Sequence, residues 1–271
     1  MEQHGDSPRK TIFAVIPARY GSRRLPGKVL LQIGGKPLIV LTAERVAAAS
    51  LVDKVIVATD DERIARAVES AGFRAEITSS EHRSGSDRVA EIALDLPENS
   101  IIVNVQGDEP LVDPAAIDRA IRALLDDRQA DVATICEQFD GPEEILDPSV
   151  VKVVVGQSGY AIYFSRQPVP FPRDAVLESG NSLSEALRRD RDLIGVFRKH
   201  IGVYVYRREY LLRFASLPPT VTELIEMLEQ LRALEDRARI RVVESNGRSI
   251  GIDTNEDFEK LKARFEASLG I

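Results

Sequence analysis

The sequence predicts an α/β fold in which helices cover both faces of a mostly parallel sheet and a smaller mixed α/β lobe follows. Through residues 11–136, short apolar runs rich in β-branched residues alternate with stretches of helical periodicity. Strands that are apolar on both faces are typical of parallel sheets buried between helices. After Pro148 the strands become shorter and a segment rich in proline and charge separates them, which indicates the lobe.

The elements are expected in a definite order. In the first part, strands are predicted at residues 11–17, 54–59, 101–106 and 131–136, with helices at 37–49, 61–71, 86–96 and 114–126. Gly72 is placed to end the second helix and Pro114 lies in the first turn of the fourth, which are positions that these residue types favour. In the second part, we predict strands at 151–155, 161–164, 201–206 and 240–243, helices at 222–235 and 255–268, and a mobile loop or lobe at 167–199.

The composition excludes several functional classes. A net charge of −7 disfavours nucleic acids and anionic membranes as partners, because both require a basic surface. The apolar runs are far shorter than the about 20 residues of a membrane helix, and residues 1–10 are too polar for a signal peptide. A cytoplasmic protein with a disordered start at residues 1–10 is therefore predicted. The single cysteine, Cys136, lies in an apolar run and can form no intrachain disulfide.

The loop after the first strand, from Pro17 to Lys28, concentrates positive charge. It contains two glycines, a serine and the four cations Arg19, Arg23, Arg24 and Lys28. Exposed backbone N–H groups together with such cations bind the phosphates of a nucleotide. The alternative is a solvated basic turn. The loop matches neither the GxGxxG fingerprint nor the GxxxxGK[ST] phosphate loop, so a dinucleotide fold and a P-loop ATPase are not supported.

From Ile16 to Lys28 the sequence reads Ile-Pro-Ala-Arg-Tyr-Gly-Ser-Arg-Arg-Leu-Pro-Gly-Lys. This string, followed by Ile-Gly-Gly-Lys-Pro at residues 33–37, resembles the nucleotide-binding signature of the sugar cytidylyltransferases, most closely of those that act on 3-deoxy-manno-octulosonate (Kdo). The resemblance runs from Ile12 to Phe258 and implies a Rossmann-like nucleotidyltransferase sheet that binds CTP with Mg²⁺ as cofactor. It assigns to the triphosphate the residues Arg19, Ser22, Arg23 and Lys28, although the family usually has a small residue in place of Arg23.

Residues 82–88, His-Arg-Ser-Gly-Ser-Asp-Arg, resemble the cytosine-binding string of the same family. The resemblance places Ser84, Gly85 and Arg88 at the nucleotide, and a small Ser-Gly turn lets the backbone approach a flat base. From the residues alone, Ser84 or Ser86 can equally cap the helix that follows.

Two acidic strings are candidates for a metal site. Asp108 directly follows an apolar strand, and a carboxylate held there can coordinate Mg²⁺ while phosphate oxygens supply other ligands. The alternative is a tight turn. The resemblance makes Asp108 a metal ligand and, through the string at residues 251–257, makes Asp253 the second ligand. Asp253 or Thr254 could instead cap the last helix.

An acidic sugar needs a cation for its carboxylate and paired donors and acceptors for its hydroxyls. Strings at residues 160–166, 200–206 and 226–232 also match the family. The resemblance assigns to the sugar the residues Gln106, Arg166, His200, Tyr204, Glu229 and Gln230. Without the resemblance, His200 could be a packed histidine and Tyr204 a core aromatic. Glu229 and Gln230 could lie on the solvated face of a helix whose opposite side buries a seam of leucines.

These assignments predict one domain at residues 11–271, with a nucleotide-binding part at about 11–136, a sugar-binding and dimerisation lobe at about 148–240 and a return to the core at about 241–271. The expected reaction is in-line attack of the anomeric hydroxyl of Kdo on the α-phosphorus of CTP, with Lys28, Asp108 and Asp253 as catalytic residues.

The resemblance further implies a homodimer and a product for lipopolysaccharide synthesis. The alternatives are a cytidylyltransferase for a related acidic sugar, of the 8-amino-Kdo or neuraminate type, a CTP-binding homologue without catalysis, and a structural protein. The stretch at residues 173–199 departs from the family's pattern and borders the proposed sugar site, so it bears on which sugar is used.

Overall fold

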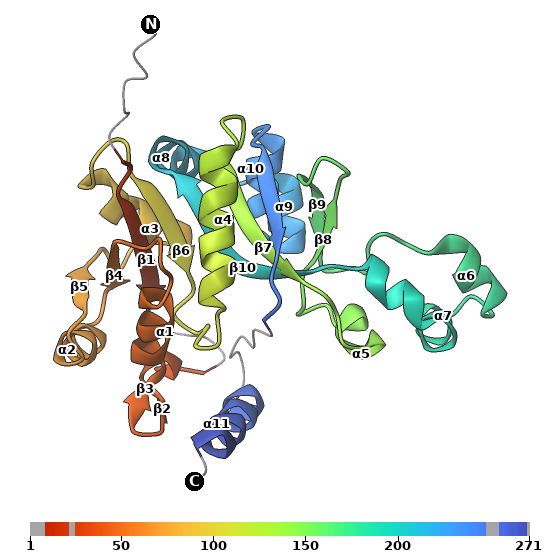
Figure 1. Ribbon diagram of the computed structural model, residues 1–271, viewed down its shortest axis with the longest axis horizontal. Helices are drawn as coiled ribbons and strands as arrows, with labels where there is room; N and C mark the ends of the chain where they lie inside the picture. The colour runs from red at the N-terminus through yellow and green to blue at the C-terminus, as the bar shows by residue number, and fades with distance from the viewer. Residues whose placement is uncertain (1–8, 22–24, 248–254, 270–271) are drawn as a thin grey trace, which may run out of the picture.

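The computed structural model describes residues 9–21, 25–247 and 255–269. Figure 1 shows a central sheet with helices packed on both of its faces and an arm that extends from one side. This is the fold class that the sequence predicted, a mostly parallel α/β sheet.

The main path of the central sheet has the strand order β11-β7-β10-β6-β1-β4-β5. Strand β10 is antiparallel to both of its neighbours, β6 and β7, whereas every other pair on this path is parallel. The part predicted as a lobe at 148–240 therefore supplies one strand to the middle of the sheet. The strands are β1 (Ile12–Ala18), β4 (Lys54–Thr59), β5 (Arg74–Ile77), β6 (Ile101–Val105), β7 (Val132–Glu137), β10 (Lys199–Arg207) and β11 (Ile240–Glu244).

Helices cover each face of the sheet with apolar side chains. One face packs against α1 (Leu38–Ala47), α2 (Glu62–Ser70) and α4 (Pro114–Asp126), and the other against α3 (Gly85–Leu94), α8 (Arg208–Ser216) and α10 (Gln230–Glu235). Burial of both faces explains why the strands are apolar throughout. Cys136 lies in the second of these cores as a free thiol, and burial raises its pKa to about 12. Among the described residues, no helix combines the length and the apolar character needed to cross a membrane.

Local sequence fixes where several helices begin. The side chain of Asp61 accepts a hydrogen bond from the backbone at the start of α2, and Asp113 does the same for α4, where Pro114 occupies the first helical position. Helix α3 begins with a capping box, in which Ser84 and Asp87 each accept from the other's backbone N–H. The capping role considered for Ser84 is thus confirmed.

The remaining elements lie at the sheet margins. They are β2 (Gln32–Ile33), β3 (Lys36–Pro37), β8 (Lys152–Val155), β9 (Ala161–Ser165), α5 (Pro142–Leu146), α6 (Arg173–Glu178), α7 (Leu183–Arg189), α9 (Val221–Glu226), α11 (Asn255–Leu269) and the 3-10 helices η1 (Lys28–Leu30) and η2 (Arg191–Val196). No periodic pattern in the sequence predicted β5, α5 or α8.

The helix predicted at residues 222–235 is wrong as a single element. The chain breaks between α9 and α10, where Met227 adopts a left-handed conformation with φ 52°. The guanidinium of Arg166 binds the carbonyl oxygens of Glu226 and Met227, which a continuous helix would use for its own hydrogen bonds. Leu224, one of the leucines of the expected buried seam, is consequently 60% exposed.

A mobile loop or lobe was predicted at residues 167–199, and the structure shows a lobe, because much of the segment is helical. Helices α6 and α7 form the arm at the right of Figure 1. Leu187 of α7 and Phe197 pack with Phe139 and Ile145 of the body in a small separate apolar cluster. This cluster anchors the segment to the body. Helices this short and rich in charge show no clear apolar periodicity, so the sequence pattern did not predict them.

Candidate active site

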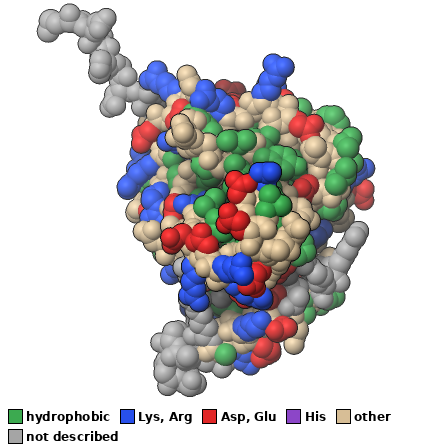
Figure 2. All heavy atoms as spheres, turned by 90° about the vertical axis from the view of Figure 1, so that its right-hand side faces the viewer, with side chains coloured by type: hydrophobic (Ala, Val, Ile, Leu, Met, Phe, Trp, Pro, Cys, Tyr) green, Lys and Arg blue, Asp and Glu red, His purple; other side chains and the backbone are tan. Residues whose placement is uncertain are grey.

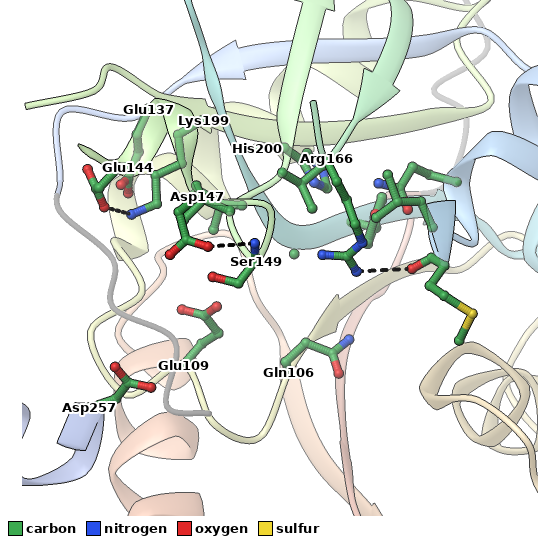
Figure 3. Close-up of a pocket in the computed structure, with 18 of the residues that line it drawn as sticks. Gln106, Glu109, Glu137, Glu144, Asp147, Ser149, Arg166, Lys199, His200 and Asp257 are labelled. Atoms are coloured by element: carbon green, nitrogen blue, oxygen red, sulfur yellow. Dashed lines mark hydrogen bonds and ion pairs between the residues drawn. The ribbon is translucent and has the colours of Figure 1, made fainter. Parts of the chain in front are cut away.

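A pocket of about 1430 Å³ lies at the carboxyl end of β6, among the start of α3, strand β10, the end of β9 and the junction of α9 and α10. Because β10 is antiparallel to β6, its first residues lie at the edge where β6 ends. Figure 3 shows side chains from these separate segments around one space. The pocket is lined by all the residues that the sequence assigned to the sugar, namely Gln106, Arg166, His200, Tyr204, Glu229 and Gln230. Their contact with a sugar stays a prediction.

Lys28 and Asp108 form an ion pair although they are 80 positions apart in the sequence. Lys28 begins the 3-10 helix after the cation-rich loop, and Asp108 follows β6, so the pair joins the loops after two neighbouring strands. Their side chains are only 14% and 21% exposed. The second carboxylate oxygen of Asp108 has no hydrogen-bond partner among the described residues, so it is available to a ligand.

The turn at the start of α3 lies tightly against the ends of β1 and β6. A Cβ atom at Gly85 would lie 3.2 Å from the Pro17 ring and 3.5 Å from Oε1 of Gln106. A side chain there would press on the Pro17 ring, whereas its contact with Gln106 would be an ordinary one, so a glycine fits this position best. Gly85 and Ser86 line the pocket, so the backbone of the predicted base-binding turn faces the same space as the sugar residues.

Arg88, which the sequence assigned to the nucleotide, is only 3% exposed. Its guanidinium donates to the carboxylate of Asp60 at 2.8 Å and to the hydroxyl of Thr78. These partners follow β4 and β5, so Arg88 ties the start of α3 to the neighbouring strands. The structure thus shows Arg88 as a support of the turn that begins α3, and the contact of Arg88 with a nucleotide stays a prediction.

Arg166 connects three segments of the pocket wall. Its Nε donates to the carbonyl of Glu226 at 2.6 Å, Nη1 to that of Pro148 at 2.9 Å and Nη2 to that of Met227 at 3.3 Å. A guanidinium has five N–H donors. One donor on each terminal nitrogen therefore remains, and such a pair matches the two oxygens of a carboxylate.

Glu229 lies near the hydroxyls of Ser84 and Ser86 and the guanidinium of Arg232, all of which interact with its carboxylate. Burial raises its pKa above the ordinary value, although these hydroxyls and Arg232 oppose the shift. Glu229 thus joins the capping turn of α3 to the start of α10.

His200 and Tyr204 belong to a row of rings along β10. The imidazole of His200 packs edge-on against Phe164 with centroids 4.8 Å apart and lies 5.4 Å from the ring of Tyr204, which stacks on Tyr206 at 5.8 Å. Burial lowers the pKa of His200 to about 3, so the ring is neutral at physiological pH. A neutral imidazole offers one donor and one acceptor.

Four predicted residues remain, and the structure describes only one of them. Arg19 is exposed at the end of β1. Ser22, Arg23 and Asp253 lie outside the described residues, so their predicted roles stay predictions. Within the described part of the chain, no group of three His, Cys, Asp or Glu side chains is arranged to hold a metal ion.

Lys152, which no sequence motif indicated, is fully buried. Its ammonium donates to the carbonyls of Asp147 and Val150, both at 2.7 Å, and of Arg166 at 2.8 Å. Burial lowers the pKa of Lys152 to about 8, because desolvation disfavours the charged ammonium. The three N–H groups of the ammonium each have one carbonyl acceptor, which favours the charged form. A lysine inside the apolar run at residues 151–155 was the signal that could have found it.

Lys199 is a second missed cation at the pocket. It immediately precedes His200 and forms an ion pair with Glu144 at 2.8 Å. Figure 3 shows this pair on the same side of the pocket as Asp147 and Ser149. Its position beside a histidine of a matched string was the available signal.

Comparison with known proteins gives a consistent result. A model of the cytidylyltransferase family matches residues 13–240. The 3-deoxy-manno-octulosonate cytidylyltransferase of Geotalea uraniireducens (strain Rf4) is 51% identical over 255 residues, which cover 94% of this chain and 99% of the relative. The protein of the same name from Geobacter sulfurreducens is 50% identical over 250 residues, 92% of this chain and 97% of the relative.

Solved structures agree with these relatives. CMP:2-keto-3-deoxy-manno-octonic acid synthetase, complexed with CTP, superposes with a TM-score of 0.84 at 38% identity, covering 96% of this chain and 100% of that one. The 4-diphosphocytidyl-2C-methyl-D-erythritol synthase of Anaerococcus prevotii has a TM-score of 0.59 at 17% identity, covering 95% of this chain and 96% of that one, which shows a shared fold alone.

Proposed function

The chain belongs to the cytidylyltransferase family, and from this premise we propose that it transfers CMP from CTP to the anomeric hydroxyl of Kdo. The new bond joins the anomeric oxygen to the α-phosphorus, and the bond from the α-phosphorus to the bridging oxygen of pyrophosphate breaks. The observation that carries the proposal is the single pocket that gathers all the predicted sugar residues beside Gly85. An acceptor sugar and a cytosine nucleotide can therefore meet there.

Arg166 is proposed to bind the carboxylate of the sugar. Its three backbone contacts fix the guanidinium in place, and two of its donors remain for a ligand. A preorganised fork of this kind fixes orientation as well as affinity. Gln106, Glu229 and Gln230 are then placed to meet the hydroxyls.

Lys28 and Asp108 are proposed to act at the phosphates. The carboxylate of Asp108 is a hard oxygen ligand with one oxygen unpartnered among the described residues, which fits Mg²⁺. Asp108 and the predicted Asp253 would hold the ion. When bound, Mg²⁺ supplies charge neutralisation at the phosphates, and Lys28 contributes a further positive charge to the developing pyrophosphate.

A homodimer is also proposed. Figure 2 shows hydrophobic side chains gathered among charged ones on the side of the molecule that carries the arm. Strand β9 and helix α9 are joined through the hydrogen bond from Ser165 to Glu226 at 2.8 Å, and both expose large apolar side chains. We call this the β9–α9 patch, and its residues are Ile162, Tyr163, Val221, Leu224, Ile225 and Met227. The proposed location is the cytoplasm, where CTP is available, and the proposed use of CMP-Kdo is lipopolysaccharide synthesis.

The test is pyrophosphate release from CTP and Mg²⁺ with Kdo, 8-amino-Kdo and neuraminate offered separately. We expect release with Kdo. Asp108→Asn keeps the shape of the side chain but removes its charge, and we expect it to slow release by at least about 100-fold. Asp174→Asn serves as the matched control, because the side chain of Asp174 is 81% exposed on the arm.

Each outcome has a definite meaning. Release with only 8-amino-Kdo or only neuraminate would keep the reaction and change the acceptor. No release with any acidic sugar, together with binding of CTP, would replace catalysis with nucleotide binding alone. An Asp108→Asn variant as active as Asp174→Asn would contradict the role of Asp108.

A further inference from the structure

We propose that Thr134 is a positioning residue for the sugar site, because its hydroxyl fixes His200 in the tautomer that carries its proton on Nε2. The bare Nδ1 nitrogen is then the acceptor for a hydroxyl of the substrate. The ligand in this inference rests on the proposed function. The tautomer does not, because it is a property of the protein without substrate.

The single proton of the Thr134 hydroxyl determines which nitrogen of His200 is protonated. The Thr134 oxygen lies 2.7 Å from the carbonyl oxygen of Val203 and 2.9 Å from Nε2 of His200. A hydroxyl has a single proton, and a carbonyl can only accept. Thr134 must therefore donate to Val203, and Nε2 of His200 must donate to Thr134. The opposite arrangement would leave two oxygen atoms 2.7 Å apart with no proton between them.

The carbonyl of Val203 needs this proton because β10 bulges at this point. Ile201 pairs with Ile135 and Tyr204 pairs with Thr134, so two residues of β10 bulge out opposite β7. A bulge leaves backbone groups outside the ladder, and a buried carbonyl without a donor is costly. The hydroxyl of Thr134 satisfies it, so the backbone rather than a ligand sets the direction of the hydroxyl.

The neutral charge of the His200 imidazole decides how many of its nitrogens carry a proton. His200 is 9% exposed and packs between Phe164 and Tyr204. Its low pKa, caused by burial, keeps the imidazole neutral, so only one nitrogen carries a proton. With that proton on Nε2, Nδ1 keeps its lone pair, and Nδ1 has no hydrogen-bond partner among the described residues. His200 lines the pocket, as Figure 3 shows.

These donor and acceptor roles select which group of the substrate can face each side chain. An Nδ1 acceptor favours a hydroxyl and opposes a carbonyl, ether or carboxylate oxygen at the same position, because two acceptors would face each other. Arg166 has the complementary preference, since it can only donate. An acidic sugar is thereby oriented with its carboxylate toward Arg166 and a hydroxyl toward His200.

The tautomer can be measured directly by long-range ¹H–¹⁵N correlation of the histidine rings in the protein without substrate. The chain has only three histidines, so the signal of His200 is identified by its loss in His200→Gln. We expect one protonated and one bare ring nitrogen, with the proton on Nε2, unchanged from pH 8 to pH 6. A proton on Nδ1, or a mixture of tautomers, would overturn the proposal even if every Thr134 variant failed to fold.

Thr134→Val has the shape of threonine without its hydroxyl, and Thr134→Ser keeps the hydroxyl as the matched control. We expect Thr134→Val to mix the tautomers and to raise the KM for the sugar about 10-fold, the equivalent of one hydrogen bond, with the KM for CTP unchanged. Thr134→Ser should behave as the wild type in both measurements. A pure Nε2–H form in Thr134→Val would contradict the role of Thr134.

The two proposals fail separately. The expected tautomer in a protein that releases no pyrophosphate with any acidic sugar would leave the role of Thr134 standing and remove the proposed function. Release with Kdo from a protein whose His200 carries its proton on Nδ1 would support the proposed function and remove the role of Thr134.

Discussion

At the residue scale, side-chain donors that bind backbone carbonyls shape the pocket. Arg166 binds carbonyl oxygens of the α9–α10 junction and of Pro148, Lys152 binds those of the loop before β8 and of the end of β9, and Thr134 binds one in the bulge of β10. These carbonyls belong to loops, to the ends of helices and strands and to the bulge, where regular secondary structure does not use every backbone group. The pocket wall is therefore held by side chains rather than by regular secondary structure.

His200 makes the stability of the protein depend on pH in a predictable direction. Its pKa is lowered from 6.5 to about 3 in the folded protein, so below pH 6.5 the unfolded chain binds a proton that the folded chain does not. The free energy of unfolding therefore falls as the pH falls, by up to about 1.4 kcal/mol per pH unit from this group. The contribution is complete above pH 6.5 and is lost on acidification toward pH 3.

Urea unfolding of the wild type and of His200→Gln at pH 7.5, 6.5, 5.8 and 5.0 measures this effect. We expect the difference in unfolding free energy to change little between pH 7.5 and 6.5 and to shift progressively against the wild type at pH 5.8 and 5.0. Other titrating groups are common to both proteins and cancel in the difference. A difference that stays flat down to pH 5.0 would show that His200 takes up a proton in the folded state.

At the element scale, the α6–α7 arm is anchored through few apolar contacts. Leu187 is fully buried in the small cluster with Phe139, Ile145 and Phe197, whereas Leu177 of α6 is 53% exposed. The cluster is separate from the two large cores of the sheet. Such a segment can open locally while the rest of the molecule remains folded.

Leu187→Ala should loosen the arm without unfolding the sheet. The cavity is expected to cost about 2–4 kcal/mol of local stability, so amide hydrogen exchange should become faster at residues 173–198. Exchange in β1 and β6 should not change. Leu177→Ala is the control and should have less than about 0.5 kcal/mol of effect, as for surface substitutions. Faster exchange throughout the sheet would show that the arm and the sheet unfold together.

At the scale of the whole molecule, the β9–α9 patch is the surface expected to meet a second copy. Ile225 is 77% exposed and Met227 72% exposed, which is unusual for large apolar side chains that lie next to each other. Burial of such a patch against its own copy would give a symmetric interface with apolar side chains at its centre.

Ile225→Glu is expected to convert a dimer to a monomer, because association would bury two unpaired carboxylates. Sedimentation velocity at about 10 μM protein gives the mass directly. Ile77→Glu places the same charge at a comparably exposed position, 56% exposed on the edge strand β5, and should leave the dimer intact. A dimer that persists in Ile225→Glu and dissociates in Ile77→Glu would move the interface to the opposite end of the sheet.

Much of the fold and part of the site could be predicted from the sequence. The strands at residues 54–59 and 101–105 and the helix at 114–126 follow from apolar runs, helical periodicity and Pro114, which are signals carried by neighbouring residues. The predicted sugar residues were named from strings, and the structure gathers them in one pocket. Such strings are local too, so the sequence alone could name these residues as candidates.

The tertiary structure alone decided which partners those local segments would meet. The helix at residues 222–235 breaks because Arg166, far away in sequence, takes its carbonyl oxygens. Lys152 is buried because three carbonyls converge on it, and the proton of His200 lies on Nε2 because β10 bulges opposite Thr134. Periodicity records which face of a segment is apolar, whereas a hydrogen bond between distant segments depends on where folding brings them.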